Sequence, residues 1–153
     1  MIHLEHLNII VKDMSESLKF YQAAFPHWKV RGGGQSKWYG HPRNWLHFGD
    51  DYTYLSLNDN GTGENKDLKK YQIGLAHFAF VSNDIRGIIA RLANVGYTPS
   101  LAYDGDNNRG SVYFVDPSGY EVEFVCYLRD DPQLRNIYQP NPDIENHNES
   151  TSP

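Results

Sequence analysis

A single cysteine, Cys126, is present among the 153 residues of the chain. One cysteine forms no internal disulfide, and it supplies too few thiolates for a zinc site built from cysteines. We interpret Cys126 as a small buried hydrophobic residue rather than a nucleophile. The fold is therefore expected to depend on ordinary packing of a hydrophobic core.

Segments that would direct the chain to a membrane or to secretion are also missing. No run of about 18 consecutive apolar residues, the length needed to cross a membrane, occurs in the sequence. The first residues enter a strand-like alternation directly, without a basic start, a long apolar stretch or a small-residue cleavage site. We expect a cytoplasmic protein with no membrane partner.

Positive charge is in short supply as well. Lys and Arg number 14 and Asp and Glu number 19, which gives a formal net charge of −5 at pH 7. Proteins that hold the phosphates of nucleic acids normally present a dense basic patch, and none is evident here. We therefore expect no nucleic-acid partner and a small organic molecule as the ligand.

What the sequence does contain is one order of elements, a strand, a helix and three strands, that occurs twice. Asp13, with Glu16 three residues later, is typical of a helix start, and Asn83 or Asp84 begins a second helix in the same way. The run Gly32–Gly34 is interpreted as a turn or flexible loop, since no Lys-Ser/Thr or following helix supports a phosphate loop. Each unit would expose an apolar sheet face that its twin can cover.

This duplication predicts an α+β fold in which two βαβββ modules surround a concave cavity as a curved, mixed half-barrel sheet. We place the first module at about residues 2–58, a polar linker at 59–73 and the second module at about 74–128. The modules together form a single domain, residues 1–128. The remaining segment, 129–153, is polar and contains prolines, so we expect a partly disordered tail.

The two units align residue against residue, because "HLNIIVKDMS" superposes on "HFAFVSNDIR" with His6 on His77. Side chains alternate between the two faces of a strand. The apolar residues on either side of each histidine are the natural partners of the helix, so His6 and His77 point to the opposite, concave face. The alignment predicts that two histidines look into one cavity.

Glu123 lies in the apolar strand "YEVEFVCYL" near the end of the second unit. A carboxylate in such surroundings is costly to bury unless it meets a cation or takes up a proton. Two imidazoles and one carboxylate from separate strands form a set that binds a divalent first-row metal and leaves positions open for substrate. Each residue alone is typical of an ordinary core or surface position. The repeated histidine favours a metal site of His6, His77 and Glu123, with Fe, Mn, Ni or Zn as the ion.

On these residues, and above all on "VYFVDPSGYEVEFV", the sequence resembles the vicinal oxygen chelate superfamily. That superfamily includes glyoxalase I, methylmalonyl-CoA epimerase, extradiol dioxygenases, fosfomycin-resistance thiol transferases and bleomycin-binding proteins. The resemblance covers residues 2 to about 128 and implies a metal held between the two modules, with His6, His77 and Glu123 on three of the ligand positions. Tyr54 falls on the fourth, where relatives have Glu, Gln or His, and a neutral phenol is a poor ligand.

The resemblance implies a divalent-metal-dependent enzyme that acts on a small oxygenated substrate by lyase, isomerase or dioxygenase chemistry. In it Glu123 holds the ion and moves protons, and Tyr54 or Tyr113 hydrogen-bonds the substrate. Asn8, from strand alternation, and Ser111 and Tyr113, from similarity to the thiol transferases, are expected to line the substrate pocket.

Several alternatives stay open at this point. A metal-free module that binds a drug or metabolite, as bleomycin-resistance proteins do, is the second functional hypothesis, and it does not need the three ligands together. The family implies a homodimer, and the sequence leaves open whether a site lies within one chain or across two. His41 and His47 are interpreted as loop or surface histidines rather than as a further catalytic histidine.

Overall fold

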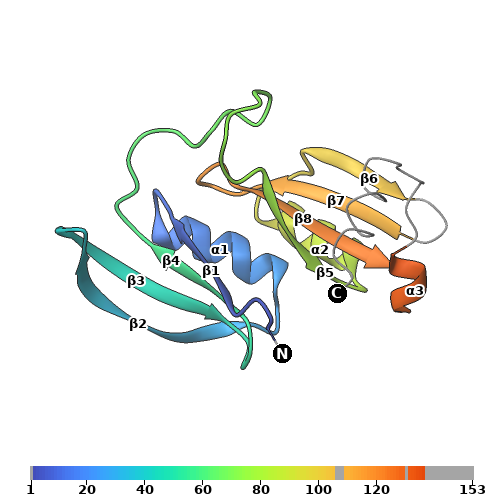
Figure 1. Ribbon diagram of the computed structural model, residues 1–153, viewed down its shortest axis with the longest axis horizontal. Coiled ribbons are helices and arrows are strands. Elements are labelled where there is room, and N and C mark those ends of the chain that lie inside the picture. The colour runs from blue at the N-terminus through green and yellow to red at the C-terminus, as the bar shows by residue number, and fades with distance from the viewer. Residues whose placement is uncertain (1, 106–108, 130, 137–153) are drawn as a thin grey trace, which may run out of the picture.

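The computed structural model describes residues 2–105, 109–129 and 131–136, which form two successive units with the same order of elements (Figure 1). The first module consists of β1 (His6–Ile10), α1 (Met14–Ala24), β2 (Lys29–Trp38), β3 (His41–Gly49) and β4 (Tyr54–Asn58). The second module consists of β5 (His77–Val81), α2 (Ile85–Asn94), β6 (Leu101–Gly105), β7 (Arg109–Val115) and β8 (Glu121–Tyr127), and the short helix α3 (Pro132–Arg135) follows it. The predicted α+β fold of two βαβββ modules is confirmed. Most of the predicted tail, 137–153, lies outside the described residues.

Each module has its own four-stranded sheet, with the order β1-β4-β3-β2 in the first and β5-β8-β7-β6 in the second. The first strand of each module pairs in parallel with the last, and all other neighbours are antiparallel. Both sheets are therefore mixed, as predicted. Since β1 and β5 each end the order of their sheet, each has one edge without a strand partner among the described residues.

The two long helices begin where the sequence indicates. The Asp13 side chain accepts a hydrogen bond from the backbone N–H of Glu16 at 2.9 Å, and Asp84 accepts one from Gly87 at 3.1 Å. Both contacts satisfy an amide that the first helical turn leaves without a partner. Gly96, with φ +94°, follows the end of α2 in the left-handed region that glycine tolerates. None of the described helices is long and apolar enough to cross a membrane.

The glycine run is neither a turn nor a loop, and that prediction was wrong. Strand β2 continues through it, with Gly32 opposite His47 and Gly34 opposite Trp45 on β3. A Cβ atom at Gly34 would lie 3.3 Å from the Trp45 ring, and one at Gly33 would lie 2.7 Å from the Trp45 carbonyl oxygen. Glycine is used here because a neighbouring backbone and an indole ring approach the strand closely.

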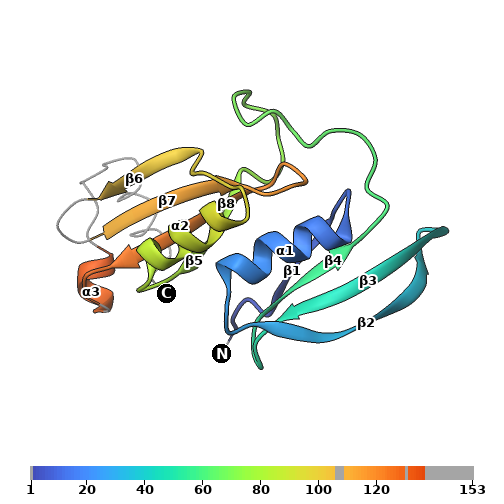
Figure 2. The same cartoon turned by 180° about the vertical axis from the view of Figure 1, so that it is seen from behind.

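The helices cover one face of each sheet and pack against each other, as Figure 2 shows with α1 and α2 in front of the strands. Aromatic contacts join the modules: the Phe25 and Phe80 ring centroids are 4.7 Å apart, and those of Phe20 and Tyr97 are 4.9 Å apart. The buried side chains of both modules form a single core cluster. We call the opposite faces, which no helix of the described residues covers, the first open face, on β1–β4, and the second open face, on β5–β8.

Candidate functional site

On the second open face, a buried carboxylate lies between a histidine and an arginine. The Glu123 side chain is only 3% exposed, and its Oε2 atom is 3.2 Å from Nε2 of His77. Its other oxygen, Oε1, is 3.2 Å from a guanidinium nitrogen of Arg109. These three side chains come from β8, β5 and β7, which lie next to one another in the sheet. Glu123, for which the sequence predicted a cationic partner, therefore has one in Arg109.

The surroundings keep the Glu123 carboxylate ionised. Burial by itself raises its pKa, but hydrogen bonds from the Ser111 and Tyr113 hydroxyls favour the charged form. The charges of His77 and Arg109 act in the same direction. The net result is a pKa for Glu123 below its ordinary value. The pKa of Tyr113 is raised, first by burial and then by its hydrogen bond to Glu123, so this phenol keeps its proton.

The predicted residues of the first module lie together on the first open face. The ring of His6 stacks on that of Tyr54, with centroids 4.7 Å apart, and Nδ1 of His6 is 2.8 Å from an exposed Glu5 carboxylate. Asn8 accepts a short hydrogen bond from the amide of Asn58, which is 1% exposed. These contacts leave His6 and Asn8 accessible on an exposed strand face.

His47 belongs to this face and lies in a strand rather than in a loop. It lies in β3, is half-buried, and has its ring centroid 4.4 Å from that of Tyr54. Its pKa is lowered, chiefly by burial and then by the positive charges of His6, Arg31 and Arg43. The Trp45 ring follows at 4.9 Å from His47. His41 also belongs to β3, at its exposed beginning, and not to a loop.

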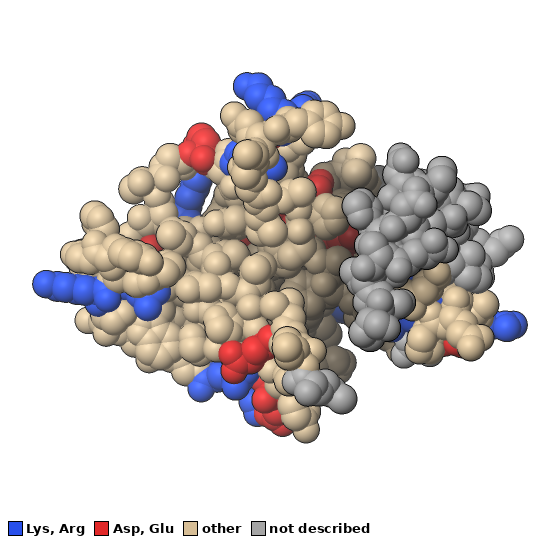
Figure 3. Space-filling view, viewed as in Figure 1, with Lys and Arg blue, Asp and Glu red and all other residues tan. Residues whose placement is uncertain are grey.

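Two arginines border this row of rings. Arg31 lies beside a break in the β2–β3 register, and its guanidinium carbon is 4.5 Å from the centre of the Tyr54 ring. A bulge commonly redirects a side chain in this way. The guanidinium carbon of Arg43 is 4.8 Å from the centre of the Trp38 ring, and Arg43 also donates to the Asn58 side chain. Figure 3 shows this side of the molecule, on which Lys and Arg lie toward the outer edge of the β2–β3 hairpin.

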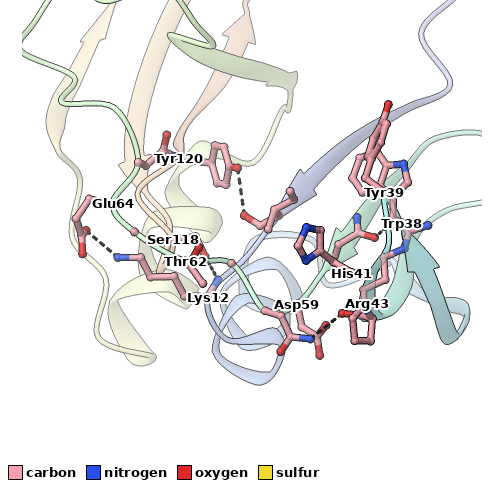
Figure 4. Close-up of a pocket in the computed structure, with 17 residues that line it drawn as sticks. Lys12, Trp38, Tyr39, His41, Arg43, Asp59, Thr62, Glu64, Ser118 and Tyr120 are labelled. Atoms are coloured by element: carbon pink, nitrogen blue, oxygen red, sulfur yellow. Dashed lines mark hydrogen bonds and ion pairs between the residues drawn. The ribbon is translucent and has the colours of Figure 1, made fainter.

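Beyond Arg43 the first open face continues into a cavity of about 900 Å³ (Figure 4). Trp38, Arg43 and Asn58 line it from the first module, and Ser118 and Tyr120 line it from the turn between β7 and β8. The Tyr120 hydroxyl donates to the carbonyl of Ile10 at 3.1 Å, which links that turn to β1. The cavity is therefore bounded by both modules of one chain.

Strand register corrects one correspondence inferred from the sequence. Asn8 pairs with Ser56, and at the equivalent place in the second module Ala79 pairs with Glu123. Ser56, rather than Tyr54, is therefore the counterpart of Glu123. The two modules differ in length between their first and last strands, so the sequence alone did not fix this pairing.

The proposed metal ligands are divided between the two open faces. His77 and Glu123 are neighbours, whereas His6 contacts Tyr54 and Glu5 in the other module. No three His, Cys, Asp or Glu side chains within the described part of the chain are grouped so that they could hold a metal ion. An imidazole and an ionised carboxylate are suitable donors for a divalent metal, so His77 and Glu123 could fill two positions of a metal site, and a third donor would have to come from elsewhere.

Several residues of the two faces were not predicted. Arg43, Trp45 and His47 alternate along one strand, and Arg109 alternates with the predicted Ser111 and Tyr113. This alternation would have found them in the sequence. Nothing local predicts that Arg31 turns to the same face, because its direction depends on the bulge between β2 and β3.

A family model described as the glyoxalase/bleomycin resistance protein/dioxygenase superfamily matches residues 3–124. Among solved structures, a glyoxylase/bleomycin resistance protein/dioxygenase domain from Frankia sp. EAN1pec superposes with a TM-score of 0.70 and 17% sequence identity, over 90% of this chain and 99% of that chain. A glyoxalase family protein from Bacillus cereus gives a TM-score of 0.69 and 12% identity, over 84% and 96%.

A third solved structure is a mutant of the fosfomycin resistance protein FosX from Listeria monocytogenes, complexed with Mn(II) and a dihydroxypropylphosphonic acid. It superposes with a TM-score of 0.64 and 20% identity, over 88% of this chain and 98% of that chain. At these identities the likeness to the three structures concerns the fold alone.

Proposed function

The chain belongs to the glyoxalase/bleomycin resistance protein/dioxygenase superfamily, and from this membership we propose that it is a divalent-metal-dependent enzyme acting on a small oxygenated organic substrate. The reaction is of the lyase, isomerase or dioxygenase type. Mn(II) in the FosX structure supports a divalent ion in this fold, and its identity here is left to measurement.

One observation carries the proposal: an ionised carboxylate is buried beside an imidazole. Glu123 is 3% exposed, and His77 lies 3.2 Å from it on the adjacent strand. Burying a charge costs several kcal/mol unless strong partners compensate, so a structural role alone would be served more cheaply by an apolar residue. A carboxylate and an imidazole held side by side suit two positions of a metal site.

We assign the third position to His6 of a second copy of the chain. His6 of the same chain lies on the other open face, and β1 and β5 each have an edge without a strand partner in the described part of the chain. A twofold arrangement that brings the first open face of one copy against the second open face of the other would unite the three ligands. The proposed enzyme is thus a homodimer whose site is incomplete in one chain.

Within such a site, the bound ion would polarise two neighbouring oxygens of the substrate and stabilise negative charge that develops there. Glu123 would hold the ion and accept or return a proton at a carboxylate oxygen. The Tyr113 hydroxyl keeps its proton at neutral pH and would donate a hydrogen bond to the substrate, with Ser111 beside it. From the first open face, Tyr54 and Asn8 would contact the substrate.

A specific contact favours the second hypothesis, a metal-free binding protein of the bleomycin-resistance kind. The guanidinium of Arg109 is 3.2 Å from Glu123, so the carboxylate has a cation partner without any metal. In that case Glu123 and Arg109 would form a structural ion pair beneath a ligand-binding surface.

Metal retention separates the two hypotheses. The protein would be dialysed against Mn, Fe, Ni or Zn at neutral pH, passed over a desalting column and analysed for metal. We expect Glu123→Gln to lower the affinity by on the order of ten- to a hundredfold or more, since even changes next to a ligand have that effect. Glu121→Gln is the matched control on the same strand, because its side chain is only half-buried and reaches the solvent. Equal retention by wild type, Glu123→Gln and His77→Ala would leave the binding-protein hypothesis.

A further inference from the structure

Two arginines, Arg31 and Arg43, lie beside the first open face. Neither arginine takes part in any ion pair with a carboxylate among the described residues. Arg31 lies over the Tyr54 ring, and Arg43 donates its hydrogen bonds to the uncharged side chains of Ser36 and Asn58. In a chain with a net charge of −5, two such arginines beside one face favour an anionic ligand.

The same face presents a row of aromatic rings beside Gly32, which has no side chain. Tyr54, His47 and Trp45 follow one another with centroid separations of 4.4 and 4.9 Å. Gly32 lies opposite His47, so a side chain at this position would rise from the same face. A Cβ atom built there meets no atom within 4 Å. The space above Gly32, beside the rings, is therefore open.

We propose that the first open face binds a small planar aromatic molecule with an anionic group, its ring over Gly32 and its charge toward Arg31. This inference rests on the proposed function, because it names the substrate class of the same site. Guanidinium groups bind carboxylates through strong charge-assisted hydrogen bonds. Aromatic side chains favour an aromatic ring over a saturated body of the same size.

Naphthoate, titrated calorimetrically into protein freed of metal with EDTA, is the probe. Two analogues separate the two parts of the proposal: naphthamide keeps the rings without the charge, and decalin carboxylate keeps the charge on a saturated frame. We expect naphthoate to bind at least about tenfold more tightly than either, since both the guanidinium contacts and the ring contacts contribute. Equal affinity for all three would overturn the proposal.

Two variants locate the site. Arg31→Gln should weaken naphthoate binding roughly tenfold, because it removes one charged donor. Gly32→Leu should abolish binding, since the leucine side chain would fill the space proposed for the ligand ring. The circular dichroism spectrum and the melting temperature should stay near those of wild type. Lys37→Gln is the matched control: it removes one charge from an exposed position on the same strand, and alternation puts that side chain on the other face.

Unchanged naphthoate affinity in Gly32→Leu would place the ligand elsewhere and overturn the inference, as would no binding to wild type at millimolar probe. The metal-free buffer keeps this result separate from the proposed function. Protein that retains a divalent metal and ignores naphthoate would contradict only the substrate class. Protein that binds naphthoate through Arg31 and retains no metal would contradict only the metal-dependent enzyme.

Discussion

The two modules share one backbone plan and differ in the chemistry of their open faces. Each has a histidine at the start of its first strand and an aromatic or polar row on the neighbouring strands. At equivalent positions of the last strand, the second module has Glu123 and the first has Ser56. Arg109 therefore meets a carboxylate, whereas its counterpart by register, Arg43, donates to the neutral side chains of Ser36 and Asn58. One substitution in a duplicated scaffold thus separates the half in which we propose metal ligands from the half in which we propose an anion-binding face.

This difference suggests why neither face is complete by itself. The second open face has a carboxylate and one imidazole, and the first has two imidazoles and two arginines that form no ion pair with the described residues. Within one chain the modules pack through their helices, which turns the two faces away from that contact. Joining the faces of two copies would bring the proposed metal ligands next to the surface proposed to bind the substrate.

The largest expected effect is the recovery of metal binding when two variants are co-expressed, which tests whether the metal site is shared between two copies of the chain. His6→Ala and His77→Ala are each expected to lose metal as pure proteins. Co-expressed, they form mixed dimers in which one site lacks both histidines and the other is intact. We therefore expect metal retention to recover to about a quarter of the wild-type value, because half of the dimers are mixed and each has one intact site of two.

The measurement is metal content per chain after affinity purification of the co-expressed pair, with each variant alone as its control. A site contained within one chain cannot be repaired by mixing, so no recovery would rule out the shared site. Sedimentation of wild type as a monomer at micromolar concentration would have the same consequence.

An intermediate effect tests the contact between the modules. The Tyr21 hydroxyl, fully buried on α1, donates to Oδ2 of Asp116 in the second module at 2.7 Å. Tyr21→Phe leaves that buried carboxylate oxygen without its donor and should lower the free energy of unfolding by about 1.5–3 kcal/mol, the range for hydrogen bonds to charged groups. Urea titration measures the change.

Tyr97→Phe is the matched control for this substitution. Tyr97 also packs on Phe20, but its hydroxyl makes no hydrogen bond to the described residues, so we expect a change within about 0.5 kcal/mol. Equal losses in both variants would show that the Tyr21–Asp116 hydrogen bond contributes nothing specific to holding the modules together.

The smallest effect concerns the charge of the first open face. The pKa of His47 lies below its ordinary value, first because of burial and then because of neighbouring positive charges. Removing one of these charges with Arg31→Gln should raise the pKa of His47, whereas Lys37→Gln should leave it unchanged. The titration of the His47 ring by NMR measures both, and a raised pKa in the control alone would contradict the prediction.

The sign of the accompanying stability change follows from the lowered pKa. The folded chain binds a proton at His47 less readily than the unfolded chain does. His47 therefore contributes stability that is fully present above its unfolded pKa and is lost as the pH falls through its folded pKa. In Arg31→Gln this contribution should be smaller.

Local rules predicted much of the fold. Asp13 and Asp84 begin their helices because a carboxylate can satisfy the free amides of a first turn. The apolar alternation around His6 predicted which side of β1 the helix covers, and Ile9 and Val11 are indeed buried. The glycine run was misread because the local signals of a turn and of a close strand contact are the same, and only the position of Trp45 on the neighbouring strand distinguishes them.

The sequence by itself determined the duplicated βαβββ order, the helix boundaries and the position of His77 and Glu123 on the sheet face opposite the helix, because these follow from period, capping and alternation within short segments. Only the tertiary structure decided that Glu123 corresponds to Ser56, that a bulge turns Arg31 over Tyr54, and that His6 lies apart from His77. Register, bulges and the packing of one module on the other depend on contacts between residues distant in the chain, and no local pattern encodes them.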